Sequence, residues 1–114
     1  MNHENIIIKL NEYIDLSKNK DKVFKKIIDT NKITFLNLRD RLLGMGTILE
    51  ENFEETFYII QVSSGFLNKN SAIVVVKWNS EEISFYGYAQ EGLINQHTAE
   101  KAVEKLIEKI NNRN

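Results

Sequence analysis

The sequence predicts an α+β fold in which an amphipathic C-terminal helix packs on an antiparallel sheet. Residues 98–111 carry apolar side chains at the i, i+3, i+4, i+7 spacing of a helix on a core, namely Ala99, Ala102, Val103, Leu106, Ile107 and Ile110. Two strand-like runs, Ala72–Trp78 and Ile83–Ala89, come before it and are separated by a short polar turn. The 114 residues fit a single α+β domain over residues 1–114, long enough to bury one core.

The N-terminal part of the chain is predicted to be helical, in two segments. Residues 4–16 place apolar side chains at helical spacing, and Asn2 is well placed to cap that helix. A polar break near residues 18–20 separates it from a second apolar set, residues 23–28. We interpret this second set as a separate helix, or else as the far end of the first one.

Residues 33–43 fit both a strand and a helix. The first of them alternate apolar and polar side chains as in a strand, whereas Phe35, Leu38 and Leu42 fit one face of a helix. We favour the helix because Thr34 can cap its start and the Gly-Met-Gly run that follows can end it. The chain is therefore expected to begin with two or three helices.

After the Gly-Met-Gly run the apolar period changes to two, which predicts strands joined by polar turns. The expected strands cover residues 47–52, 57–64, 72–78 and 83–90. Residues 64–70 are expected to form a loop, and residues 91–97 lead into the final helix, with Thr98 as its N-cap. Consecutive strands with short turns form a meander, so we expect an antiparallel sheet of three or four strands.

The register of the last hairpin follows from its loop. A four-residue loop, Asn79–Glu82, pairs Trp78 with Ile83, and alternate side chains then share a face. One face is strongly apolar and should lie under the helices; it carries Val74, Val76, Trp78, Ile83 and Phe85. The opposite face carries the candidate binding residues, which are Lys77, Ser84, Tyr86, Tyr88 and Gln90.

Two interpretations of this second face are open. Tyrosine combines a large rigid ring with a hydrogen-bonding tip and is favoured in interfaces, and a neighbouring lysine can hold an anion or stack on a ring. The face would then bind a partner. In the alternative interpretation, the N-terminal helices must pack somewhere and cover the tyrosines.

Composition and motifs exclude several classes of function. A formal net charge of −1 provides no field that would attract nucleic acid or an anionic membrane. The chain contains no cysteine, which excludes disulfides, thiolate catalysis and cysteine-based zinc sites. Its two histidines, His3 and His97, belong to no triad or metal-binding pattern, so we expect no catalytic residue, no metal and no cofactor.

Two charged stretches are most simply solvated surface. Residues 18–26 are basic and residues 50–55 are acidic, but neither has the accompanying residues of a phosphate or calcium site. Because the two charges are opposite, head-to-tail association of one copy of the chain with another is a further expectation. A homodimer is also compatible with the sequence.

The leading hypothesis is a small cytoplasmic protein-binding module that covers a partner's surface, such as an inhibitor, an immunity-type protein or an adaptor from a mobile element. The expected partner is another protein rather than nucleic acid or a membrane. The cytoplasmic assignment rests on the lack of a signal-peptide pattern and of a long apolar segment. The alternative is a protein that sequesters a small molecule or nucleotide through Lys77, Tyr86 and Tyr88. An enzyme that uses carboxylates and tyrosines is the third hypothesis.

Overall fold

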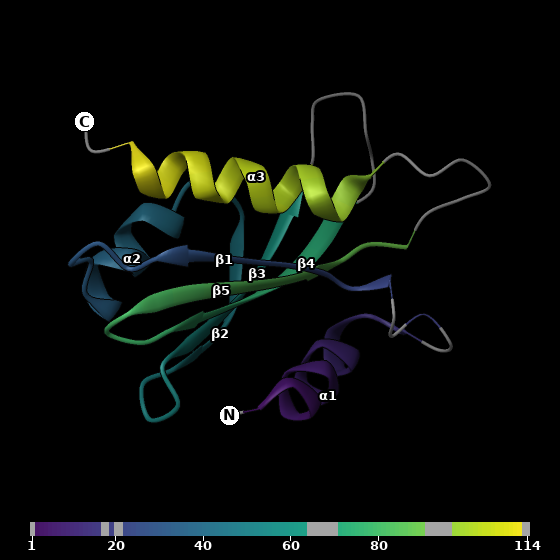
Figure 1. The fold of residues 1–114 in the computed structure, drawn as a ribbon. Helices are drawn as coiled ribbons and strands as arrows, with labels where there is room; N and C mark the ends of the chain where they lie inside the picture. The colour runs from purple at the N-terminus through teal and green to yellow at the C-terminus, as the bar shows by residue number, and fades with distance from the viewer. Residues whose placement is uncertain (1, 17–18, 20–21, 64–70, 91–96, 113–114) are drawn as a thin grey trace.

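A computed structural model of the chain describes residues 2–16, 19, 22–63, 71–90 and 97–112. These residues form an α+β fold, which confirms the predicted class, with helices on both faces of an antiparallel sheet (Figure 1). The described helices are α1 (His3–Tyr13), α2 (Phe35–Leu42) and α3 (Thr98–Asn111). The described strands are β1 (Phe24–Asp29), β2 (Thr47–Asn52), β3 (Phe57–Ser63), β4 (Ser71–Trp78) and β5 (Glu82–Tyr88).

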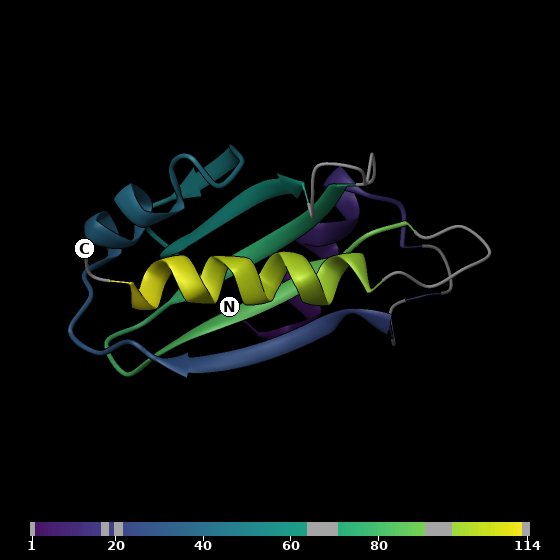
Figure 2. The ribbon, with the colours of Figure 1, turned by 90° about the horizontal axis from the view of Figure 1, so that it is seen from above.

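The strands lie in the order β1-β5-β4-β3-β2, and each neighbouring pair is antiparallel. The predicted meander runs from β2 to β5. In the described part of the chain β1 then adds a fifth strand beside β5, where three or four strands were expected. α3 runs along one face as predicted, α1 lies on the other, and α2 lies beside the C-terminal end of α3 (Figure 1 and Figure 2).

The prediction of a helix over residues 23–28 is wrong, because Phe24–Asp29 forms β1. Phe24 and Ile28 both pack into the core under α3. Residues four positions apart share a face in a helix and in a strand alike, so their spacing did not distinguish the two. Pairing with the edge of β5, over every residue of β1, decided the outcome.

The helix ends largely follow the side chains that the sequence indicated. Asn2 caps α1 by accepting a hydrogen bond of 2.9 Å from a backbone N–H of the first turn. Thr34 caps α2 in the same way at 3.1 Å, which confirms the helix within residues 33–43. At α3 the cap position is His97, with a left-handed φ of 55°, and Thr98 is already helical. The predicted cap at Thr98 is therefore wrong by one residue.

The face of the sheet under α3 holds the larger apolar cluster. The hairpin register is confirmed, with Trp78 opposite Ile83, so the predicted apolar face lies under α3. α3 approaches the sheet closely at Gly87, where an added Cβ would lie 3.0 Å from Cγ2 of Val103. The fully buried members of this cluster include Leu38, Leu42, Tyr58, Ile60, Val74, Val76, Ile83, Phe85, Ala102, Val103 and Leu106.

α1 covers the opposite face and forms a second, smaller cluster with it. The residues of this cluster are Ile6, Ile7, Leu10, Leu16, Phe57, Ile59, Ile73, Val75, Tyr86 and Tyr88. α1 is shorter than α3, and the end of the sheet nearest the β4–β5 turn extends past it (Figure 1). This uncovered end positions the candidate site.

Some predictions fall on parts of the chain outside the described residues. They are the loop at 64–70, the connection at 91–96 and most of the break near 18–20. Among the helices that are described, none has both the length and the apolar character needed to cross a bilayer.

Candidate functional site

The predicted binding face lies under and beside α1. Tyr86 and Tyr88 are only 5% and 7% exposed, because α1 packs on them, and the ring centre of His3 lies 5.8 Å from that of Tyr86. Of the two interpretations that the sequence left open, covering by an N-terminal helix is the one observed. Gln90 is exposed, and its side-chain amide nitrogen lies 3.5 Å from the backbone oxygen of Asp15.

The other two candidate residues, Lys77 and Ser84, belong to a row of side chains that crosses the sheet. From β2 to β1, the strand registers give this row as Asn52, Phe57, Lys77, Ser84 and Ile27. Directly opposed residues of antiparallel strands point to the same side, so the whole row lies on the α1 face. Lys77 is partly exposed in the row and Ser84 is buried.

Lys77 holds the turn between β2 and β3. Its amine donates hydrogen bonds to Oγ1 of Thr56 (2.9 Å) and to the backbone oxygen of Trp78 (3.0 Å). Burial lowers the pKa of the Lys77 amine below its usual value, against an opposing attraction from Glu55. Thr56 has a φ of 54°, which is unusual for a β-branched residue, and its backbone oxygen accepts the N–H of Trp78 at 2.9 Å. The contacts from Lys77 and Trp78 thus fix a strained residue at the turn.

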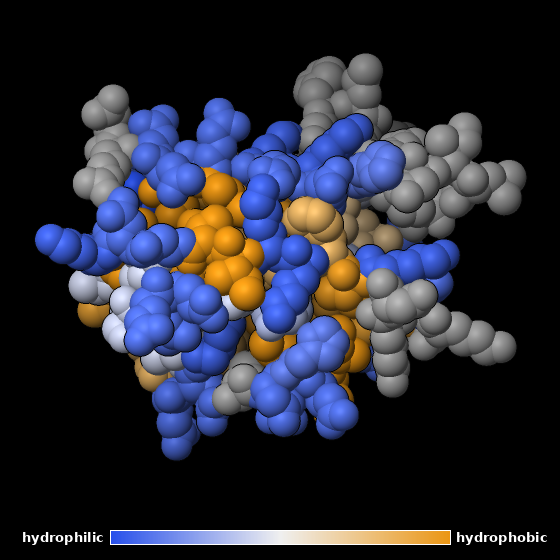
Figure 3. Space-filling view, in the orientation of Figure 1, coloured by the Kyte–Doolittle hydropathy of each residue, from blue (hydrophilic) through white to orange (hydrophobic). Residues whose placement is uncertain are grey.

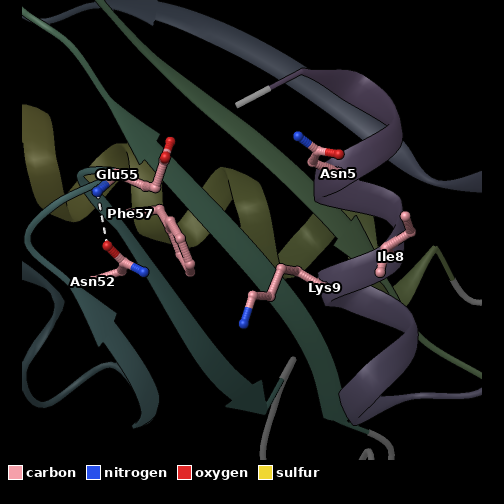
Figure 4. A pocket seen from close by; sticks show the side chains of 6 residues that line it. All are labelled: Asn5, Ile8, Lys9, Asn52, Glu55 and Phe57. Atoms are coloured by element: carbon pink, nitrogen blue, oxygen red, sulfur yellow. Dashed lines mark hydrogen bonds between the residues drawn. The ribbon is translucent and has the colours of Figure 1, made fainter.

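A groove separates this turn from α1. It is lined by Asn5, Ile8, Lys9, Asn52, Glu55 and Phe57, and we call it the α1 groove. Its volume is about 320 Å³ and it is open to solvent (Figure 4). In the close-up, Lys9 extends from α1 toward the strands, and Asn52 and Glu55 stand on the opposite wall. Two of the lining residues, Asn52 and Phe57, also belong to the cross-strand row.

Glu50 of β2 fastens α1 to the wall of the groove. Its carboxylate accepts a hydrogen bond from the hydroxyl of Tyr13 (2.6 Å) and pairs with the amine of Lys9 (3.0 Å). Burial would raise the pKa of the Glu50 carboxyl, but the hydrogen bonds from Tyr13 and Lys9 outweigh it and leave the pKa below its usual value. The same hydrogen bonds raise the pKa values of Lys9 and Tyr13.

The α1 groove combines an apolar part with a polar rim. Phe57 closes its floor and Ile8 stands on its α1 side, while two amides, an amine and a carboxylate form the rim. Part of the rim is already engaged, because the side-chain oxygen of Asn52 accepts the N–H of Glu55 at 2.7 Å. Phe57 itself is only 1% exposed, so the exposed apolar surface of the groove comes from Ile8.

Ile8 is not among the predicted binding residues, although it is 62% exposed. The signal was present, because three consecutive isoleucines span about 200° around a helix axis and cannot all face the sheet. Ile6 and Ile7 are buried, and Ile8 points away from the core.

Some members of the two charged stretches make contacts within the described part of the molecule. Glu50 and Glu51 alternate along β2, so Glu50 meets Lys9 on the α1 face while Glu51 binds Arg39 of α2 on the other. In the basic stretch, the amine of Lys26 lies 2.8 Å from a carboxylate oxygen of Glu104 on α3. Across the described ranges, no group of three or more histidine, aspartate or glutamate side chains could hold a metal ion.

Comparison of the chain with protein-family models, with curated proteins and with solved structures found no match. The geometry of the described residues is therefore what indicates a function. Within that geometry, the α1 groove is a hollow with an exposed apolar side chain, Ile8, at its rim.

Proposed function

We propose that the protein is a protein-binding module that acts by covering the surface of a partner, as an inhibitor, an immunity-type protein or an adaptor does. The observation that supports this most is Ile8, which is 62% exposed on the rim of the α1 groove. A β-branched apolar side chain gains about 1.5–3 kcal/mol when it is fully buried, so a partner that covers Ile8 gains affinity. The cytoplasm, which the cysteine-free composition fits, remains part of this proposal.

The surroundings of Ile8 also favour a macromolecular partner. Small-molecule sites usually enclose most of the ligand surface, whereas the α1 groove is open to solvent. Sequestration of a nucleotide was expected to use the faces of Tyr86 and Tyr88 for base stacking, and α1 covers both of these tyrosines. The small-molecule alternative therefore has less support than protein binding.

The proposal can be tested by replacing Ile8 with glutamate and comparing it with Leu36→Glu. Leu36 is the matched control, because it is also 62% exposed in a helix but lies on α2, on the opposite face of the sheet. The free energy of unfolding of both variants should lie within about 0.5 kcal/mol of that of the wild type, as is usual for surface substitutions. A photo-crosslinking side chain is introduced at position 8 or 36 in the host, and crosslinked proteins are identified by mass spectrometry.

We expect one protein to crosslink from position 8 and not from position 36. In a separate pull-down without the crosslinker, the same protein should bind the wild-type chain and Leu36→Glu, but not Ile8→Glu. Equal capture by the two variants would remove the α1 groove from consideration. A chain that captures no protein but carries a retained small molecule in native mass spectrometry would overturn the protein-binding proposal in favour of the alternative.

A further inference from the structure

β1 forms an edge of the sheet that accepts further pairing. It pairs with β5 over all six of its residues without a register shift, and no described strand lies on its other side (Figure 2). An edge strand presents a row of backbone N–H and C=O groups to solvent, which is a template for another strand. The opposite edge, β2, is less suited to pairing because its register shifts between Ile48 and Glu50.

The two lysines of β1 are not positioned to block pairing of a second strand at this edge. Lysine side chains usually protect edge strands by standing in the way of a second strand. Here the amine of Lys26 is bound to Glu104 of α3 at 2.8 Å, on one face. The amine of Lys25 lies 5.1 Å from the ring centre of Tyr86, on the other face. Both lysines are thus turned back onto their own sheet.

An apolar side chain is exposed between the two lysines and the end of the strand. Ile27 is 45% exposed and lies on the α1 face, beyond the part that α1 covers. The space-filling view, which looks onto the β1 edge of the molecule, shows apolar patches in the middle of this side, among hydrophilic side chains (Figure 3). The β1 edge thus combines free backbone groups with a partly exposed isoleucine.

We propose that β1 pairs with β1 of a second copy of the chain, antiparallel, about a two-fold axis at Ile27. Opposed residues of an antiparallel pair lie on the same face, whereas neighbours along a strand lie on opposite faces. A two-fold axis normal to the sheet must therefore place one residue opposite its own copy, and not opposite the copy of its neighbour. An axis at Lys26 would oppose this lysine to its own copy. An axis at Ile28 would place the apolar Ile27 of each copy opposite the charged Asp29 of the other. An axis at Ile27 opposes the two isoleucines and brings Lys25 of each copy opposite Asp29 of the other.

The charge pattern therefore selects the second copy as the occupant and Ile27 as the centre. Lys25, Ile27 and Asp29 share the α1 face, so the pair consists of one apolar contact flanked by two identical lysine–aspartate contacts, for which the amine of Lys25 leaves the ring of Tyr86. The two sheets then become continuous across the axis, which closes the interface without forming a fibre. The proposal goes beyond the proposed function and uses a different surface, so either can fail alone.

The first test reverses the charges. The wild-type chain should form a dimer that dissociates on dilution, as expected of a small interface, and sedimentation equilibrium measures its Kd. Lys25→Asp opposes aspartates and should weaken the dimer about tenfold or more, whereas the double variant Lys25→Asp with Asp29→Lys restores opposite charges and should return the Kd to within about threefold of wild type.

The double variant distinguishes a loss of pairing from a loss of folding stability. Asp29 also accepts the N–H of Asn31 at 2.7 Å, so Asp29→Lys removes a contact in the turn that follows β1. Recovery of the dimer despite that loss supports the proposed register. A wild-type chain that stays monomeric at ~1 mM, or a double variant as weak as Lys25→Asp alone, would overturn it.

The second test uses the absence of cysteine from the chain. Ile27→Cys introduces a single thiol at the axis, where opposed Cα atoms would be about 4.5–5.5 Å apart, within disulfide range. Under a mild oxidant we expect a dimer that a reducing agent separates, with far less from the exposed control Leu36→Cys. Equal yields from the two variants, or no dimer from Ile27→Cys, would contradict the two-fold pairing.

Discussion

The two faces of the sheet differ in how completely a helix covers them. α3 has 14 residues, buries six of them and is flanked by α2, so the face beneath it is closed. α1 has 11 residues and buries three, and the sheet extends past it with Lys77 partly exposed and Ile27 at the edge. The difference indicates that the α3 face supplies most of the stability, whereas the α1 face combines a smaller core with accessible surface.

The largest expected effect comes from making the same cavity in each face and comparing the loss in the free energy of unfolding. Leu106 of α3 and Leu10 of α1 are both fully buried. Leucine-to-alanine changes in cores cost about 2–5 kcal/mol, depending on how far the surroundings relax. We expect Leu106→Ala to cost about 4 kcal/mol and Leu10→Ala about 2–3 kcal/mol, because the short α1 can shift toward the cavity. Urea unfolding measures both, and a larger loss for Leu10→Ala would reverse the comparison.

A second experiment measures how one buried residue of the α3 face, Tyr58, contributes to stability as a function of pH. The hydroxyl of Tyr58 donates to the backbone oxygen of Phe35 at 2.6 Å, and burial raises the pKa of Tyr58 to about 12. The unfolded chain loses this proton near pH 10 while the folded chain keeps it, so stability falls as pH rises from about 10 to 12. Two pKa units correspond to about 2–3 kcal/mol.

The control for this effect is Tyr58→Phe. It removes the hydrogen bond and lowers stability at neutral pH by about 1 kcal/mol, but its loss of stability between pH 10 and 12 should be smaller than that of the wild type by the same 2–3 kcal/mol. Unfolding in urea across this pH range provides the measurement. Parallel pH curves for wild type and variant would show that Tyr58 does not control the alkaline transition.

The smallest expected effect concerns the attachment of α1. Glu50→Gln weakens the contacts of this side chain with Lys9 and Tyr13 and should cost no more than about 1 kcal/mol at neutral pH, because the pair is near the surface. The folded-state pKa of Glu50 is depressed, so its contribution is present above the ordinary carboxyl pKa of 4.5 and is lost as pH falls through the lower folded value. The wild-type advantage should therefore shrink in acid.

Glu54→Gln provides the matched control for Glu50→Gln, since Glu54 is exposed in the β2–β3 turn. Its stability difference from wild type should be near zero at neutral pH. Hydrogen exchange of α1 amides gives a local readout, which should accelerate in Glu50→Gln and not in Glu54→Gln. Unchanged hydrogen exchange in both variants would show that Glu50 does not hold α1 on the sheet.

The parts of the fold that could be predicted are those that local chemistry determines. The spacing of Leu106 and its neighbours indicated α3, Thr34 indicated the start of α2, and the loop Asn79–Glu82 gave the register of Trp78 with Ile83. β1 could not be predicted in this way, because Phe24 and Ile28 share a face in either secondary structure. What distinguished the two was β5, which is almost sixty residues further along the chain.

The candidate site shows the same division. That Lys77, Ser84, Tyr86 and Tyr88 share one face follows from alternation along two strands, and the registers confirm it. Whether this face meets solvent depended on where α1 packs. The three consecutive isoleucines of α1 show only that one of them must face outward. The α1 groove, which lies between α1 and a turn some forty-five residues away, was therefore beyond sequence reasoning.

By itself the sequence determined the α+β class, the amphipathic α3, the last hairpin and its two faces, since these depend on periodicity and turn length within a few residues. Only the tertiary structure decided that residues 24–29 form an edge strand, that α1 covers Tyr86 and Tyr88, and that Ile8 and Ile27 remain exposed. The physical reason is that side-chain exposure and strand pairing are set by contacts between distant segments, for which the local pattern of apolar residues permits more than one solution.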